Sequence, residues 1–279
     1  MALALSKPFR IQPELQLSEL QATELRLIAR RTWRYFERFV TAEDHMLPPD
    51  NFQQQPQPAI AHRTSPTNIG MYLLSVAVAR DFGWLATSAA IQRLQATFAT
   101  LRQLRTCHGH FFNWYDTRDL RPLEPVYVSS VDSGNLAGHL IALANTCDEW
   151  QNQLYSPQAQ QGLGDNLALA QLSLQQAPTL LLQSQSGLQL QAILSQLDKL
   201  LQQNDCLQHQ HSQLTELCEQ GVQIASARQN TTFTRHTEQQ LSAQQSLLFY
   251  LQALQTTLAE QHLQLNSDAA EQQHQHLQQ

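Results

Sequence analysis

Four segments between residues 17 and 150 place apolar side chains at steps of three and four residues, which predicts that this part of the chain is helical. We expect helices over 17–40, 65–82, about 87–104 and about 132–150. Ser18 and Gln21 form a capping-box pattern at the first helix. Ser65 followed by Pro66 is typical of a helix N-terminus, because serine caps and proline suits the first position.

The segment 105–131 lacks a helical pattern. Residues 111–115 and 126–128 have the aromatic and β-branched side chains of strands, and Asp119 and Pro122 between them favour turns. A short β-hairpin or an irregular loop is therefore expected here. Residues 41–63 contain Pro48-Pro49 and are expected to form a long ordered loop.

The first helix carries an arginine-rich face. Its apolar stripe is expected to contain Leu25, Ile28, Ala29, Trp33, Phe36 and Phe39 or Val40. Four arginines lie mostly off that stripe: Arg30, Arg31, Arg34 and Arg38. Phosphate binding is one interpretation, but Glu24 and Glu37 dilute the positive charge, so we favour a solvated face.

Alternating helix directions bring three polar clusters together. If consecutive helices are antiparallel, the second and fourth helices are parallel, and their N-termini share one face. These N-termini carry the polar runs 62–68 and 129–135. The segment that contains residues 113–116 joins the third helix to the fourth, so it must end on the same face. Such an arrangement is typical of antiparallel helical hairpins in an (α/α)6 toroid, whose site lies at the N-terminal ends of the inner helices.

The side chains in these clusters are those of a sugar-binding site, which combines aromatic platforms with paired hydrogen-bonding groups. The candidate substrate-binding residues are Asp50, Asn51, Arg63, Thr67, Asn68, Asn113, Trp114, Tyr115, Asp116, Asp132, Ser133 and Asn135. For any one residue a structural role is an equal alternative: Asp132 and Ser133 would cap the fourth helix, and Trp114 would belong to the core.

Catalytic and metal-binding groups are sparse. Glycoside chemistry requires two carboxylates about 5–10 Å apart. The best-placed carboxylates are Asp116, Glu124 and Asp132, and of these we take Asp116 and Asp132 as the catalytic candidates. Four histidines do not complete a metal site with acidic partners: His62, His108, His110 and His139. We expect no metal and no cofactor.

Residues 151–279 form a second region that contains 34 glutamines and no tryptophan. Leucine stripes at 194–201 and 247–258 predict a helical hairpin or bundle over about 158–265, with a frayed end at 272–279. A low-complexity interaction segment is the alternative. The expected division is thus a partial helical domain over 1–150 and a glutamine-rich helical segment over 151–279.

Charge and cysteine usage limit the partners. The chain has a net charge of −6 and only two lysines, which argues against nucleic acid or an anionic membrane surface. Its four cysteines have no metal-type spacing and are expected to be free thiols. We expect no membrane segment and no signal peptide, which indicates a cytoplasmic protein.

Motifs over about 28–150 resemble the cyclic β-1,2-glucan synthases. They are Leu-Pro-Pro-Asp-Asn-Phe-Gln at 47–53, His-Arg-Thr-Ser-Pro-Thr-Asn-Ile-Gly at 62–70, Asp-Phe-Gly-Trp at 81–84, the run 109–120 and the run 127–139. In that family these motifs open a middle, glycoamylase-like domain of transglycosylase type. The family enzymes are large inner-membrane proteins that also carry a glucosyltransferase fed by UDP-glucose and a phosphorylase-like domain.

The resemblance implies a fragment of a carbohydrate-active enzyme that binds β-1,2-glucan but lacks the catalytic carboxylates. These are expected in later motifs of the middle domain, of Tyr-Tyr-Asp-Leu-Leu and Trp-Ser-Gly-Ser-Met-Phe-Glu type, which this chain does not contain. Its partners would be the glucan and the rest of a synthase, at the cytoplasmic face of the inner membrane. The alternative is a stand-alone helical module that binds glycans or proteins without enzymatic activity.

Overall fold

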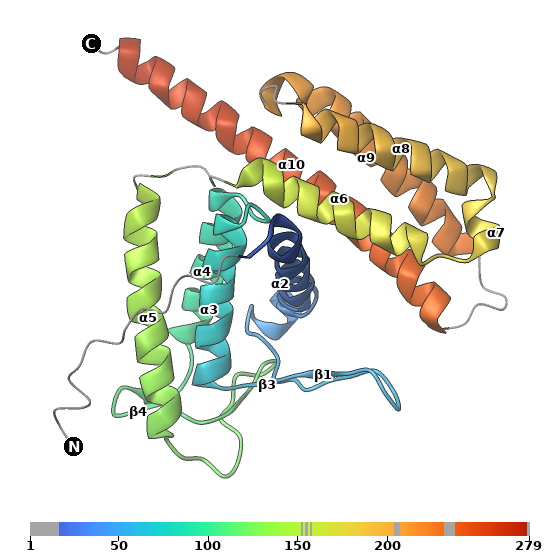
Figure 1. Cartoon of the computed structure of the whole chain (residues 1–279). Helices are drawn as coiled ribbons and strands as arrows, with labels where there is room; N and C mark the ends of the chain where they lie inside the picture. The colour runs from blue at the N-terminus through green and yellow to red at the C-terminus, as the bar shows by residue number, and fades with distance from the viewer. Residues whose placement is uncertain are drawn as a thin grey trace.

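The protein is all-α with three small antiparallel strand pairs (Figure 1). The computed structural model describes residues 17–151, 153, 156, 158–203, 207–231 and 238–277. The helices are α2 (Glu19–Phe39), α3 (Pro66–Asp81), α4 (Thr87–Leu101), α5 (Ser130–Gln151), α6 (Ala159–Gln175), α7 (Thr179–Leu182), α8 (Gln185–Gln202), α9 (Leu207–Thr231) and α10 (Glu238–Leu277), with a 3-10 turn η1 at Ala42–Asp44. The strands are β1 (Phe52–Gln53), β2 (Ala59–Ile60), β3 (Arg63–Thr64), β4 (Thr106–Cys107), β5 (His110–Phe111) and β6 (Tyr115–Asp116).

The predicted N-terminal caps of the first two helices are confirmed. Ser18 Oγ accepts a bond of 3.3 Å from the Gln21 amide, and Gln21 Oε1 accepts one of 3.0 Å from the Ser18 amide. At α3, Ser65 Oγ accepts from the Asn68 amide at 3.2 Å. These bonds satisfy amides that have no partner within the helix, and they fix where each helix begins.

The fourth predicted helix begins two residues earlier than expected. Asp132 and Ser133 do not cap it, because α5 starts at Ser130 and Ser129 Oγ accepts a bond of 3.2 Å from the Asp132 amide. Asp132 therefore lies in the first turn, where its negative charge complements the helix dipole.

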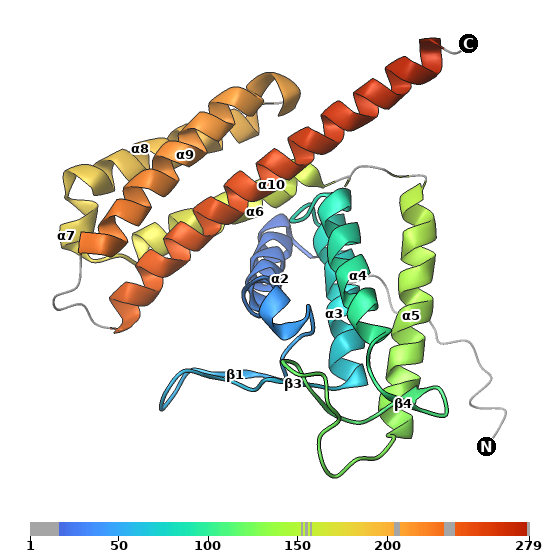
Figure 2. The same ribbon diagram turned by 180° about the vertical axis from the view of Figure 1, so that it is seen from behind.

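Helix α3 is the centre of the N-terminal core. It lies beside α2, α4 and α5 (Figures 1 and 2). Ile69, Tyr72, Leu73 and Val76 of α3 are fully buried. Its exposed side chains include the apolar Met71 and Val78, so the helix has no continuous polar face towards solvent. Helix α5 runs parallel to α3, because hydrogen bonds join the two helices at both ends.

The irregular segment contains a different hairpin from the one expected. Strands β4 and β5 form a tight hairpin, with Thr106 opposite Phe111 and Cys107 opposite His110. Residues 126–128 are not a strand, contrary to the prediction, although the Asn113 amide donates to the Tyr127 carbonyl at 2.9 Å. Strand β6 instead pairs with β3, which precedes α3.

The arginine face of α2 is only partly solvated, so that prediction was wrong for Arg30. Arg30 is fully buried, and its guanidinium contacts Glu37 at 2.6 Å and Asn166 at 2.7 Å. Leu25 and Ile28, expected in the apolar stripe, are 52% and 56% exposed. The buried face of α2 is thus rotated towards the arginines, because α6 supplies polar partners for them.

The second region forms its own apolar cluster from α6 to α10. The predicted leucine stripes are confirmed, since all of these side chains are buried: Leu194, Leu197, Leu201, Leu247, Leu251, Leu254 and Leu258. Helix α10 crosses α6 and continues to Leu277, so the backbone remains helical over most of the end expected to fray (Figure 2). Cys206 and residues 278–279 lie outside the described residues, and Cys107, Cys147 and Cys218 are free thiols.

Buried polar contacts join α6 to the N-terminal helices. Asp165 accepts from Arg26 at 2.6 Å and from the Trp84 indole at 2.8 Å. The backbones of Gly83 and Gly162 approach so closely that a Cβ on Gly162 would lie 2.3 Å from the Gly83 carbonyl oxygen. Only glycine fits at that crossing. Within the described part of the chain, no helix is both long enough and apolar enough to cross a membrane.

Candidate functional site

The N-terminal ends of α3 and α5 meet on one face of the molecule. Thr67 Oγ1 donates to Asp132 Oδ1 at 2.5 Å, and Asn135 Nδ2 donates to Thr67 Oγ1 at 3.1 Å. These bonds place the first turns of the two helices side by side, and the Trp150 indole donates to Asp81 at 3.2 Å at their other ends, so the helices run parallel as the sequence predicted. Asp132 is half-buried and Asn135 is exposed, so both side chains reach solvent at this face.

A second group joins the loop before β1 to the start of α3. Arg63 donates to Asp50 Oδ2 from Nε at 3.0 Å and from Nη2 at 2.8 Å. Asn68 Nδ2 lies 3.4 Å from Asp50 Oδ1, and the side-chain nitrogen Nδ2 of Asn51 donates to Asp50 Oδ2 at 3.2 Å. Asp50 is therefore held by charge-assisted bonds, which orient the guanidinium of Arg63.

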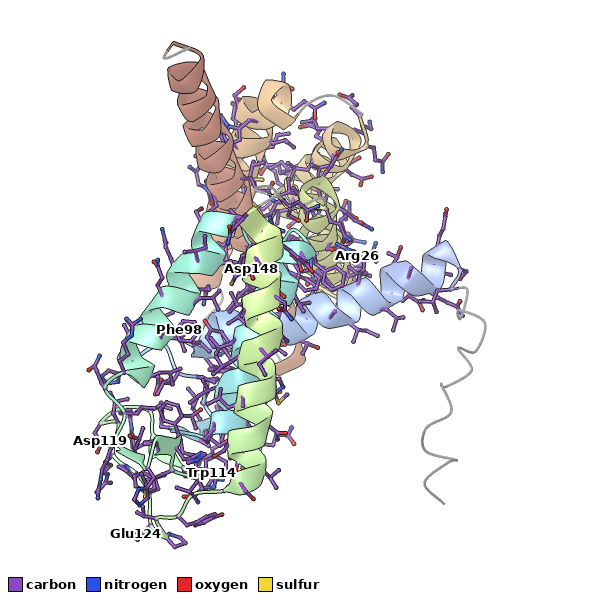
Figure 3. The ribbon with its side chains drawn as sticks, turned by 90° about the vertical axis from the view of Figure 1, so that its left-hand side faces the viewer. Arg26, Phe98, Trp114, Asp119, Glu124 and Asp148 are labelled. Atoms are coloured by element: carbon purple, nitrogen blue, oxygen red, sulfur yellow. The ribbon has the colours of Figure 1, made fainter. Side chains whose placement is uncertain are left out.

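Trp114 lies on the same face. The Arg63 guanidinium carbon is 5.0 Å from the centroid of the Trp114 ring, within the range of a cation–π contact. Figure 3 places Trp114 at the end of the molecule where α5 begins, with Asp119 and Glu124 nearby and Asp148 at the opposite end of that helix. The indole is only half-buried, so part of its ring is available to a ligand.

Three predicted binding residues are instead buried in the framework. Tyr115 has no exposed surface; its hydroxyl donates to the Arg105 carbonyl and accepts from the Phe112 amide, both at 2.7 Å. Its ring therefore has no face for a sugar in this structure. Asn113 is 3% and Asp116 is 7% exposed. Their role is to fix the loop that carries Trp114.

Asp116 has the wrong electrostatics for a proton donor. Hydrogen bonds from the Arg118 guanidinium, at 3.1 and 3.3 Å, hold the pKa of this carboxyl below its ordinary value. A general acid in glycoside hydrolysis requires the opposite shift. Glu124 accepts from the amide of Val126 at 3.2 Å, which is a local turn contact.

Ser133 takes no part in the hydrogen bonds of this polar face. Its hydroxyl oxygen is buried and has no hydrogen-bond partner. Asp132 and Asn135, by contrast, both form hydrogen bonds with Thr67. Among the described residues, no group of three or more His, Cys, Asp or Glu side chains could hold a metal ion.

Two features of this face were missed by sequence reasoning. His62 Nδ1 lies 2.8 Å from Oδ1 of the buried Asp44, which also accepts from Thr117 Oγ1. This pair fixes the imidazole of the residue that precedes Arg63 in the chain. Tyr127 is 52% exposed and offers a second aromatic ring, but the sequence pattern placed it in a strand. Asp44 carried no local signal, because its partners come from loops distant in the sequence.

The fold and this face define an all-α protein in which polar and aromatic side chains gather where α3 and α5 begin. No family model matches the chain. It is similar to the curated protein "Cyclic beta-(1,2)-glucan synthase NdvB" of Rhizobium meliloti (strain 1021), with 53% identity over 178 residues. This similarity confirms the resemblance to the cyclic β-1,2-glucan synthases that the motifs indicated. The match covers 62% of this chain but only 6% of the relative.

Proposed function

We propose that this chain contributes glucan-binding residues to a transglycosylase-type domain of cyclic β-1,2-glucan synthesis. The observation that carries the proposal is the contact between the N-terminal ends of α3 and α5, where Thr67 bonds to both Asp132 and Asn135. It is supported by the 53% identity over 178 residues to a cyclic β-(1,2)-glucan synthase. On this proposal, residues 1–150 are part of an (α/α)6 toroid, and 151–279 form an attached helical segment.

The arrangement suits a glucan chain in two respects. Carboxylate and amide side chains that are already joined by hydrogen bonds bind sugar hydroxyls without a large ordering cost. Arg63, Asp50 and Asn68 supply one such group, and Asp132 with Asn135 supplies another. Trp114 lies beside the first group and offers an apolar surface to a pyranose ring.

The proposal assigns binding, not bond cleavage, to this chain. A glycosidase needs one carboxyl with a raised pKa and a second carboxylate within reach. Asp116 has a lowered pKa because of Arg118, and Asp132 accepts a hydrogen bond from Thr67. We therefore expect the catalytic pair to be supplied by another part of a synthase.

A stand-alone module for glycan or protein binding is the second candidate. It is favoured by apolar side chains at the surface: Leu20 of α2 is 70% exposed, and Val131 and Ile141 of α5 are 70% and 66% exposed. Such surface is typical of a contact with another protein. This candidate predicts association with a protein partner and gives no role to the groups around Thr67.

Hydrogen–deuterium exchange with and without a linear β-1,2-glucan oligosaccharide distinguishes the two. We expect the ligand to slow amide exchange at 62–68 and 129–135, and to leave α8 and α9 unchanged. Protection absent from both segments at millimolar ligand, or spread evenly over the chain, would contradict the proposal.

A further inference from the structure

Three arginines of α2 remain without an acidic partner after the buried ion pairs are formed. Asp165 pairs with Arg26 at 2.6 Å, and Glu37 pairs with Arg30 at 2.6 Å. The other three arginines recur at steps of three and four residues and share one side of the helix: Arg31, Arg34 and Arg38. Among the described residues, none of these three makes a salt bridge.

These arginines line two adjoining hollows. The first lies between α2, α6 and α10, has a volume of about 520 Å³, and contains Arg31 and Arg34. The second lies between α2, the β1–β2 hairpin and α10, has a volume of about 530 Å³, and contains Arg34 and Arg38. Both hollows are also lined by Ser242 and Ser246, so they form one groove with Arg34 at its centre.

The described lining of this groove contains no carboxylate. Its other polar groups are neutral: Ser173 of α6, Gln176 just after α6, Gln54 and Gln55 between β1 and β2, and Ser242, Gln245, Ser246 and Tyr250 of α10. The chain as a whole carries a net charge of −6, so three uncompensated guanidinium groups in one groove are a local exception. Hydroxyl and amide groups beside them can donate further hydrogen bonds to an anion.

Arg34 is held in place before any ligand binds. Its Nη1 donates to Ser246 Oγ at 2.9 Å, and its guanidinium carbon lies 4.4 Å from the ring centroid of Phe249 and 5.3 Å from that of Tyr250. A guanidinium fixed in this way loses little freedom when it binds an anion. Ser246 accepts from Arg34, so its own hydroxyl proton is left to donate.

We propose that this groove binds an anion that carries two or more linked phosphate groups. Arg31 and Arg38 are seven residues apart, which is about 10 Å along a helix, so the three arginines meet a linear anion rather than a single point charge. Guanidinium groups bind phosphate oxygens in bidentate fashion. The inference does not depend on glucan binding, because no residue of the polar face at Thr67 lines the groove.

A purely structural role explains only part of this arrangement. Arg34 joins α2 to α10, and this contact alone would account for its burial against Phe249. It does not account for Arg31, which is exposed at the rim of the first hollow, or for a described lining without a carboxylate. Two variants separate the roles: Arg31→Gln removes charge outside the Arg34 contact, and Ser246→Asp adds a competing carboxylate.

The test is calorimetric titration of the full chain with inorganic tripolyphosphate, compared with inorganic monophosphate. We expect one site per chain for tripolyphosphate, weaker binding of monophosphate, and a loss of affinity as salt rises. Arg31→Gln and Ser246→Asp should each weaken binding about tenfold or more, since each removes or blocks a charge-assisted bond. The matched control is Arg102→Gln, which removes an exposed arginine that lies outside the groove and should leave affinity unchanged.

Circular dichroism and thermal unfolding of each variant show whether the fold is intact. Wild-type protein that does not bind tripolyphosphate at millimolar concentration would overturn the proposal. Equal weakening by Arg31→Gln and Arg102→Gln would also overturn it, because the attraction would then be a diffuse property of the surface. Full affinity in a folded Ser246→Asp variant would place any binding outside this groove.

Discussion

Replacing Trp114 with alanine should weaken glucan binding strongly while the fold survives. The indole is half-buried and contacts the Arg63 guanidinium, a contact worth about 0.5–1 kcal/mol at an exposed site. A fully buried tryptophan would cost about 3–5 kcal/mol on truncation, so we expect about 1–2 kcal/mol here. That corresponds to a fall in Tm of roughly 2–8 °C for a chain of this size.

The expected loss of affinity is larger than for any single hydrogen-bonding group. A sugar that covers at most about half of the roughly 150–250 Å² of an aromatic side chain buries about 100 Å², or about 2.5 kcal/mol. This is about a 60-fold change in Kd, whereas one lost hydrogen bond of about 0.5–1.5 kcal/mol gives at most about a tenfold change.

Calorimetric titration and thermal unfolding should be carried out on the same preparation. Trp150→Ala is the matched control: Trp150 is 5% exposed and its indole donates to Asp81 at 3.2 Å, at the C-terminal end of α5. We expect this control to lower Tm more than Trp114→Ala does and to leave the Kd unchanged wherever the protein is folded. A large loss of Tm in Trp114→Ala, with normal affinity at low temperature, would refute the reasoning and place Trp114 in the core.

Three further outcomes follow from the structure. The isolated chain should release no reducing ends and form no cyclic product from linear β-1,2-glucan; turnover that Asp116→Asn or Asp132→Asn abolishes would contradict this. Glu260→Gln should raise Tm at pH 7, because burial raises the pKa of Glu260 in the folded state, so ionisation costs stability above the unfolded pKa. The gain in Tm should vanish below about pH 4, where the carboxyl is protonated in both the folded and the unfolded state. A gain in Tm that does not change with pH would show that the raised pKa of Glu260 is not its cause. Asp165→Ala should cost about 3–5 kcal/mol in chemical unfolding, since it leaves the buried Arg26 and the Trp84 indole without their partner.

The helices of the N-terminal part could be predicted because their signals are local. A serine cap, a proline in the first turn and an apolar spacing of three and four residues act within one or two turns, so Ser18 and Ser65 were assigned correctly. The meeting of α3 and α5 followed from helix order alone. The start of α5 was misplaced because Ser129, Asp132 and Ser133 are all good capping residues, and the sequence does not rank them.

What the sequence did not predict depends on partners far along the chain. Arg30 was expected to be solvated, yet Asn166, 136 residues away, makes its burial possible. Tyr115 was expected to be a sugar platform, but the carbonyl of Arg105 and the amide of Phe112 enclose its hydroxyl. Periodicity reports which side of a helix is apolar, not whether a distant polar group will cover the other side. The binding role of the remaining site residues, and the division at residue 150, stay predictions.

The most direct test of the glucan-binding face compares two asparagines of α5. Asn135 donates to Thr67 at the proposed site, whereas Asn145 is exposed ten residues further along the same helix, towards its other end. In calorimetric titration with a linear β-1,2-glucan oligosaccharide, we expect wild-type protein and Asn145→Ala to bind with equal affinity. Asn135→Ala should weaken binding roughly two- to tenfold, as the loss of one hydrogen-bonding group requires. Equal affinities for the two variants, or a wild-type chain that does not bind at millimolar ligand, would contradict the account.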